Sequence, residues 1–149
     1  YGPHEDHKGT MASVIYHGYF QIKKDGEMKL FKSYKKGFGD GEQKRDFVYV
    51  RDVVKVIEFF LDHPEHSGIY NVGTGKARTF VDLATGLFTA LDLTPNISFI
   101  DMPETLKDKY QYFTEADMSK LHAIGYTEPF FELEDGIKDY VKYLKTIYA

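Results

Sequence analysis

The chain has 149 residues, which is enough for one domain with a hydrophobic core, and its net charge of −4 argues against nucleic-acid binding through a basic face. It has no cysteine, which excludes disulfides and thiolate zinc sites and fits a reducing compartment such as the cytoplasm. No apolar run is as long as a membrane span, and no signal peptide is visible.

The first thirty residues predict a loop, a helix and a strand. Residues 1–9 are a loop that opens on the turn signal Tyr1-Gly2-Pro3 with no Met before it, so we expect part of a longer protein. Thr10 is expected to cap the following helix, and Asp25-Gly26 ends it. The helix has an apolar stripe formed by Met11, Val14, Ile15, Tyr19 and Ile22.

The next segment predicts a strand, a loop and a second strand that leads into a helix. Met28–Phe31 is a short strand, and the glycine-rich residues 32–44 predict a mobile surface loop. The strand formers of 47–50 predict a strand that ends at a helix start beside Asp52. The helix carries apolar residues on one face, at Val53, Val56, Ile57, Phe60 and Leu61, and His63-Pro64 stops it.

The second half alternates in the same way and predicts an α/β or α+β fold. Residues 68–72 predict a buried strand, Thr79 with Asp82 a capped helix start, and 97–100 a further strand. Thr114 is expected to cap a short helix with Met118 and Leu121 facing inward. The last helix places its apolar residues on one side, at Leu133, Ile137, Tyr140, Val141 and Leu144.

Arg45 is the first candidate binding residue. It lies just before the strand formers of 47–50 and close to a predicted helix start. A guanidinium held there can bind a phosphate or diphosphate through two parallel hydrogen bonds. The alternative is a weak surface ion pair with Asp46 or Asp52, and the residues alone leave both interpretations open.

Two further motifs predict no site. Gly73-Thr74-Gly75-Lys76 lacks the upstream glycine of a phosphate-binding loop, and Arg78 stands where a dinucleotide fingerprint needs its third glycine. The two His-x-x-His pairs have no third ligand nearby, so we expect no metal site. Lys8, in a loop before a helix and beside His7, can lose its proton more easily and act as a base, although a solvated lysine is the simpler interpretation.

Three motifs together resemble the C-terminal half of extended short-chain dehydrogenase/reductases that act on nucleotide-sugars. They are Tyr1-Gly2-Pro3, Arg45-Asp46-Phe47-Val48-Tyr49-Val50-Arg51-Asp52-Val53 and Tyr70-Asn71-Val72-Gly73-Thr74-Gly75. Two more stretches narrow the resemblance to members that epimerise C6 of ADP-linked heptose, namely 7–14 (HKGTMASV) and 106–111 (LKDKYQ). The resemblance covers essentially the whole chain.

The resemblance implies an NADP-dependent epimerase that oxidises C6 to a ketone and returns the hydride to the opposite face, for lipopolysaccharide inner-core synthesis. It implies that residues 1–149 form the substrate-binding portion, together with strands and helices that complete a Rossmann domain. The cofactor loop and the catalytic Tyr-x-x-x-Lys motif are not in the chain. Tyr19 and Lys23 have that spacing, but Tyr19 lies on the apolar stripe, so the role is not transferred.

The resemblance also assigns roles to single residues. Lys8 matches the acid/base of the second face and lies near the cofactor, and Arg45 matches the diphosphate-binding arginine. The other matches are substrate contacts, at Thr10, His17, Phe31, Lys32, Ser33, Tyr34 and Tyr110. The loop at 35–42 is longer than in some members, which affects the alignment of 32–34.

The resemblance implies a homo-oligomer, notably a pentamer, with ADP-heptose as substrate. Two alternatives stay open. One is another extended family member, such as a hexose 4-epimerase or a 4,6-dehydratase. Lys8 within His-Lys-Gly-Thr-Met is the feature that distinguishes the heptose epimerases from these members. The other is a non-catalytic module that only binds a nucleotide-sugar.

Overall fold

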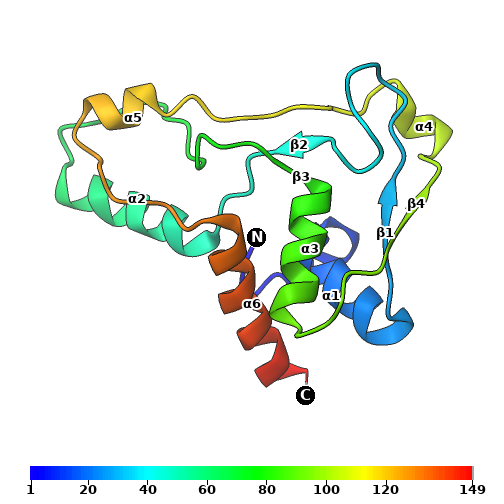
Figure 1. The fold of residues 1–149 in the computed structure, drawn as a ribbon. Coiled ribbons are helices and arrows are strands. Elements are labelled where there is room, and N and C mark those ends of the chain that lie inside the picture. Colours follow the sequence, from blue (N-terminus) through cyan, green and yellow to red (C-terminus); the bar gives the residue numbers. More distant parts are fainter. Residues whose placement is uncertain (149) are drawn as a thin grey trace.

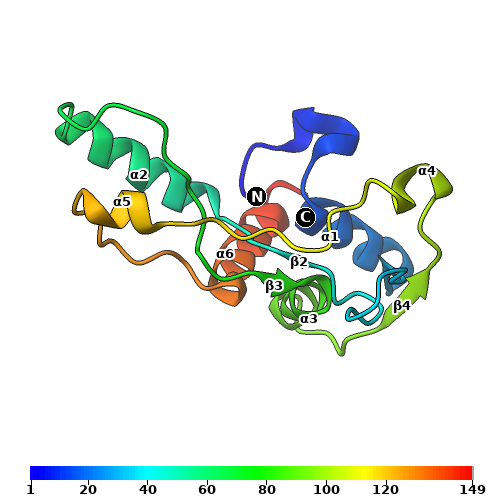
Figure 2. The ribbon, with the colours of Figure 1, turned by 90° about the horizontal axis from the view of Figure 1, so that it is seen from above.

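The computed structural model describes residues 1–148, and its elements fall into two groups (Figure 1). The larger group contains three helices and a strand pair: α1 (Val14–Asp25), α3 (Phe80–Ala90), α6 (Leu133–Ile147), β1 (Met28–Phe31) and β4 (Ile97–Ile100). The smaller group contains α2 (Val50–Asp62) and α5 (Ser119–Ala123), which lie side by side at one end of the molecule (Figure 2). Four short elements complete the chain: η1 (Asp6–Met11), β2 (Lys44–Arg45), β3 (Arg78–Thr79) and α4 (Glu104–Lys107).

Two strand pairs organise the chain. β1 and β4 are parallel, in a register that runs from Met28 opposite Ile97 to Phe31 opposite Ile100, which confirms both predicted strands. β2 and β3 are antiparallel, with Lys44 opposite Thr79 and Arg45 opposite Arg78. Parallel strands joined through helices are typical of the predicted α/β class.

The larger hydrophobic core forms where α3 and α6 pack together, with α1 against α3. The predicted capping box is present: the Thr79 hydroxyl accepts from the Asp82 amide at 2.9 Å, and the Asp82 carboxylate accepts from the Thr79 amide at 3.0 Å. The apolar side of α6 is buried as predicted, at Leu133, Ile137, Tyr140, Val141 and Leu144. Each such side chain contributes about 1.5–3 kcal/mol when it leaves water.

The predicted start of α1 was wrong. Ser13, not Thr10, is the N-cap, and its hydroxyl accepts a hydrogen bond from the Tyr16 amide. The buried carboxylate of Glu5 accepts from the Ser13 amide at 2.8 Å and from its hydroxyl at 2.6 Å, which fixes the cap there. The residues before Ser13 form the separate helix η1, so Met11 is 83% exposed instead of joining the buried stripe.

The predicted strands at 47–50 and 68–72 were also wrong. Neither segment pairs with a strand within residues 1–148, and a strand forms only when a neighbour accepts its hydrogen bonds. Tyr1 takes the neighbour's place at the first segment: its amino group donates to the Val48 carbonyl at 3.0 Å, and its carbonyl accepts from the Val50 amide at 2.9 Å. In the second segment Ile69 is 88% exposed.

The apolar face of α2 is only partly covered. Val56 is buried in a second cluster with Met118, Leu121 and Tyr126, which confirms the inward Met118 and Leu121. Ile57 and Leu61, two predicted members of the stripe, are exposed, and Ile57 borders a groove of about 430 Å³. No side chain caps α5, so the predicted Thr114 cap was wrong. Within residues 1–148, no helix combines the length and apolarity needed to cross a membrane.

Candidate functional site

Arg45 lies on β2 with its guanidinium between two aromatic rings. Its Cζ atom is 5.2 Å from the ring centroid of Tyr110 and 5.8 Å from that of Phe80. Its Nη1 atom donates to the Lys44 carbonyl at 2.9 Å. A cation at these distances is attracted to the ring faces, and the planar guanidinium is held in one orientation.

The alternative interpretation of Arg45 as a surface ion-pair residue was wrong. No ion pair among residues 1–148 contains Arg45. Asp52 is fully buried and accepts from the Phe131 amide at 2.9 Å. Asp46 is turned to other partners, and its two oxygens accept four hydrogen bonds, from the Thr74 amide and hydroxyl and from the amides of Gly75 and Ala116. Both carboxylates are therefore engaged away from the guanidinium.

Two other predicted residues meet at Arg45. The ring of Phe31 contacts that of Tyr110 edge-on, with 6.2 Å between centroids, and Tyr112 contacts Tyr110 in the same way at 5.6 Å. Burial raises the pKa of the Tyr110 hydroxyl, and the charge of Arg45 opposes that rise. The structure thus brings Phe31, Arg45 and Tyr110 together, although they come from three separate segments.

Lys32, Ser33 and Tyr34 lie next to this cluster. The Tyr34 amide donates to the Tyr112 hydroxyl at 3.0 Å, which joins the loop to the aromatic residues. The Lys32 ammonium and the Tyr34 hydroxyl both donate to one oxygen of Asp101, at 3.2 and 2.8 Å. These contacts lower the pKa of the Asp101 carboxyl. The hydrogen bond from Tyr34 has the largest effect, and the hydrogen bond and charge of Lys32 come next.

Asp101 and Tyr112 are residues that the sequence analysis missed. Asp101 is the first residue after β4, a position at the carboxyl end of a parallel strand where ligands bind in open α/β sheets. Tyr112 follows the predicted Tyr110 by two residues and is buried, with its hydroxyl bonded to the loop. The strand end was a usable signal for Asp101, whereas no local pattern identifies Tyr112.

Lys8, Thr10 and His17 form a separate set. Lys8 and Thr10 are exposed on η1, which Figure 2 shows beside the start of α1, and His17 is exposed on α1. Among residues 1–148, no hydrogen bond, ion pair or ring contact joins these three to Arg45 or Tyr110. The structure therefore does not bring these three residues into contact with Arg45 or Tyr110.

The backbone amides of the Gly73-Thr74-Gly75 turn are already occupied. The amides that would cradle one, at Thr74 and Gly75, donate instead to Asp46. A Cβ atom at Gly73 would lie 2.5 Å from an oxygen of Asp46, so glycine is required by this close approach. The turn holds a carboxylate of the chain itself, which gives the physical reason why the motif is not a phosphate-binding loop.

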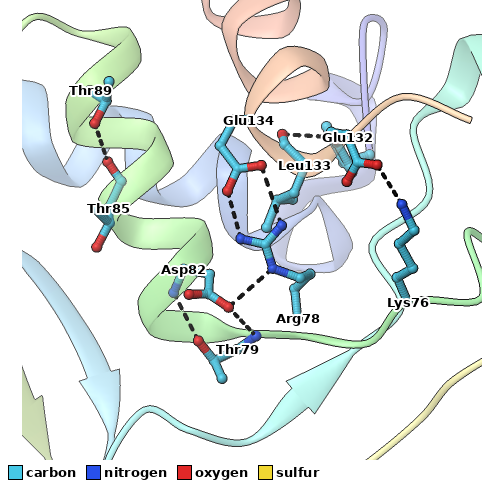
Figure 3. Close-up of polar contacts among 10 residues, drawn as sticks. Lys76, Arg78, Thr79, Asp82, Thr85, Thr89, Glu132, Leu133 and Glu134 are labelled. Carbon is cyan, nitrogen blue, oxygen red and sulfur yellow. Dashed lines mark hydrogen bonds and ion pairs between the residues drawn. The ribbon is translucent and has the colours of Figure 1, made fainter.

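The basic side chains next to β2 are paired, in contrast to Arg45. Figure 3 shows the Arg78 guanidinium between Asp82 and Glu134, at 3.2 Å from Asp82 and 2.6 Å from the nearer Glu134 oxygen. It also shows Lys76 bonded to Glu132. Both cations border a cavity of about 280 Å³, but their carboxylate partners already neutralise them. Within residues 1–148, no group of three His, Asp or Glu side chains is placed to hold a metal ion.

Comparison with known proteins identifies relatives that are about twice as long. The model of the NAD dependent epimerase/dehydratase family matches residues 1–73. ADP-L-glycero-D-manno-heptose-6-epimerase of Fusobacterium nucleatum is 55% identical, over 95% of this chain and 45% of that protein. The chain therefore spans about half the length of such relatives.

Solved structures of epimerases are also similar to this chain. The crystal structure of the Helicobacter pylori ADP-L-glycero-D-manno-heptose-6-epimerase is 31% identical with a TM-score of 0.77, over 97% of this chain and 41% of that chain. The Thermus thermophilus UDP-glucose 4-epimerase in complex with NAD is 26% identical with a TM-score of 0.74, over 97% of this chain and 43% of that chain. The fold is that of extended epimerases and dehydratases, as the sequence predicted.

Proposed function

We propose that this chain, whose residues 1–73 match the model of the NAD dependent epimerase/dehydratase family, is the substrate-binding portion of an ADP-L-glycero-D-manno-heptose 6-epimerase. The enzyme would invert C6 of ADP-D-glycero-D-manno-heptose in the cytoplasm, for the lipopolysaccharide inner core. The observation that carries the proposal is Arg45, a guanidinium held on two rings with no carboxylate partner among the described residues. Such a group fits the diphosphate of a nucleotide-sugar.

The cluster of Phe31, Arg45 and Tyr110, here called the Arg45 cluster, would bind the nucleotide half of the substrate. Arg45 would grip the diphosphate through two parallel hydrogen bonds, because its fork matches two phosphate oxygens. The rings of Phe31 and Tyr110 offer apolar surface next to it, and Lys32, Ser33 and Tyr34 offer polar groups at the edge of the same cluster. Aromatic side chains with a few placed polar groups are typical of small-molecule sites.

The group on η1 and α1 would serve the sugar. Lys8 would move a proton at the C6 oxygen on one face, and Thr10 and His17 would contact the substrate. Lys8 fits a place beside a nicotinamide cofactor, because its ammonium is exposed and belongs to no ion pair within residues 1–148. NADP, when bound, supplies the acceptor and donor of the hydride.

The test uses the full-length enzyme with ADP-D-glycero-D-manno-heptose and either NADP or NAD, and follows the C6 configuration by NMR. We expect inversion at C6, faster with NADP. Turnover of a UDP-hexose with no inversion of the heptose would instead assign the chain to another branch of the family. Binding of ADP-heptose without any turnover would leave only a nucleotide-sugar-binding module.

A further inference from the structure

We infer that Asp46 is a positioning residue for nucleotide-sugar binding, because its carboxylate ties together the segments that carry Arg45, Phe80 and Tyr110. The inference rests on the proposed function of Arg45. Asp46 follows Arg45 directly in the chain, so the pair looks at first like an ion pair, but the structure gives Asp46 a different task.

The carboxylate of Asp46 is saturated by donors from distant parts of the chain. One oxygen accepts from the Thr74 amide at 2.7 Å and from its hydroxyl at 2.6 Å. The other accepts from the Gly75 amide at 2.9 Å and the Ala116 amide at 3.1 Å. Hydrogen bonds to a charged acceptor are about twice as strong as neutral ones, so this is a strong junction.

The same two segments flank the strand that carries Arg45. On one side β3 pairs with β2 and leads directly into Phe80. On the other side the Lys44 amide donates to the Tyr112 carbonyl at 2.9 Å, and the Thr114 amide donates to the Lys44 carbonyl at 3.2 Å. β2 thus lies between its two neighbours, and Asp46 holds both of them where β2 ends.

This junction sets the position of both rings relative to the guanidinium. Phe80 follows the turn that Asp46 holds, and Tyr110 precedes the segment that reaches Ala116. If the junction loosens, both rings are free to shift away from Arg45. An asparagine has only one acceptor oxygen, and its NH₂ group would face an amide donor at the second position.

The experiment compares Asp46→Asn with wild type in the full-length enzyme. Titration calorimetry with ADP should show affinity reduced about tenfold, because the donors from Thr74, Gly75 and Ala116 lose a charged acceptor. The KM for ADP-heptose should rise with it, while NADP affinity and kcat at saturation stay within about threefold. The matched control is Asp52→Asn, which also removes a carboxylate that accepts a hydrogen bond from a backbone amide, here the amide of Phe131. It should lower the melting temperature but leave ADP affinity unchanged.

The outcomes separate this inference from the proposed function. Unchanged ADP affinity in Asp46→Asn, with reduced affinity in Arg45→Ala, would overturn the positioning role and leave the proposed function intact. An equal loss in Asp52→Asn would make the effect one of general stability and would also overturn it. If Asp46→Asn does not fold, Thr74→Val removes one of the four donors, and it should weaken ADP binding in the same direction by a smaller factor.

Discussion

Arg45 and Lys8 lie in opposite physical settings. Arg45 is half-buried between two rings on a strand that has a neighbour on each side. Lys8 is exposed on η1, a six-residue 3-10 helix with no buried residue. The first residue is held in place before any ligand arrives, whereas nothing among the described residues fixes the second.

The difference follows from what each residue is proposed to do. A diphosphate-binding group gains affinity when its orientation is fixed in advance, because less freedom is lost on binding. An acid/base group must reach a proton at the reacting carbon, and its geometry tightens only in the complex with substrate. Four measurements test this contrast.

The largest effect is expected from Lys8→Met in the full-length enzyme. Methionine keeps the apolar stem and removes the exchangeable protons, so turnover should fall by about two to four orders of magnitude. Substrate affinity and melting temperature should change little, because Lys8 buries almost no surface. Lys24→Met, at another exposed lysine, is the control. Turnover within about threefold of wild type would return Lys8 to a solvated surface role.

Arg45→Ala should act on binding instead. A charge-assisted contact to a diphosphate contributes about 1.5–3 kcal/mol, so affinity for ADP-heptose should fall roughly ten- to hundredfold. Arg45→Lys should restore only part of this, since the fork geometry is lost. Arg51→Ala is the matched control, because Arg51 is exposed and pairs with Asp139 at 3.3 Å. Equal affinities for wild type and Arg45→Ala, measured by calorimetry, would contradict the proposed role.

Tyr110→Leu tests the ring beneath the guanidinium. Leucine keeps apolar bulk but removes the ring face, which costs about 1 kcal/mol, or roughly fivefold in substrate affinity. The control is Tyr70→Leu, since the Lys120 ammonium also lies over that ring, at 4.4 Å from its centroid. Both variants should lose a similar cation–ring contact, but only Tyr110→Leu should weaken binding of ADP. Equal affinity in the two variants would show that the ring does not orient Arg45.

The smallest effect concerns pH. Burial alone would raise the pKa of Asp46, but the hydrogen bonds from Thr74, Ala116 and Gly75 outweigh it and hold the pKa below its ordinary value. The stabilisation is therefore fully present above the unfolded pKa of about 3.9 and is lost as pH falls through the lower folded value. The melting temperature of wild type should exceed that of Asp46→Asn at pH 7, and the gap should narrow below about pH 4. A gap that does not depend on pH would exclude this charge effect.

Predictions from short sequence patterns were correct where a helix forms its hydrogen bonds within itself or packs through one apolar face. The capping box at Thr79 formed because its partners are three residues apart, and the stripe of α6 was buried because helical spacing alone sets its face. The segments at 47–50 and 68–72 are also rich in residues that favour strands. They failed because a strand depends on a partner that its own sequence does not specify.

The amino-acid sequence by itself determined the β1 and β4 strands, pointed to the epimerases that the chain resembles and singled out Arg45 as a candidate binding residue, because these rest on residue type and local order. Only the tertiary structure showed that Arg45 forms no ion pair with Asp46 or Asp52. The answer depends on where the Asp46 carboxylate points, and its partners lie 28, 29 and 70 residues further along the chain. No local pattern encodes contacts at such separations. Whether Arg45 has a carboxylate partner therefore depends on the folded chain.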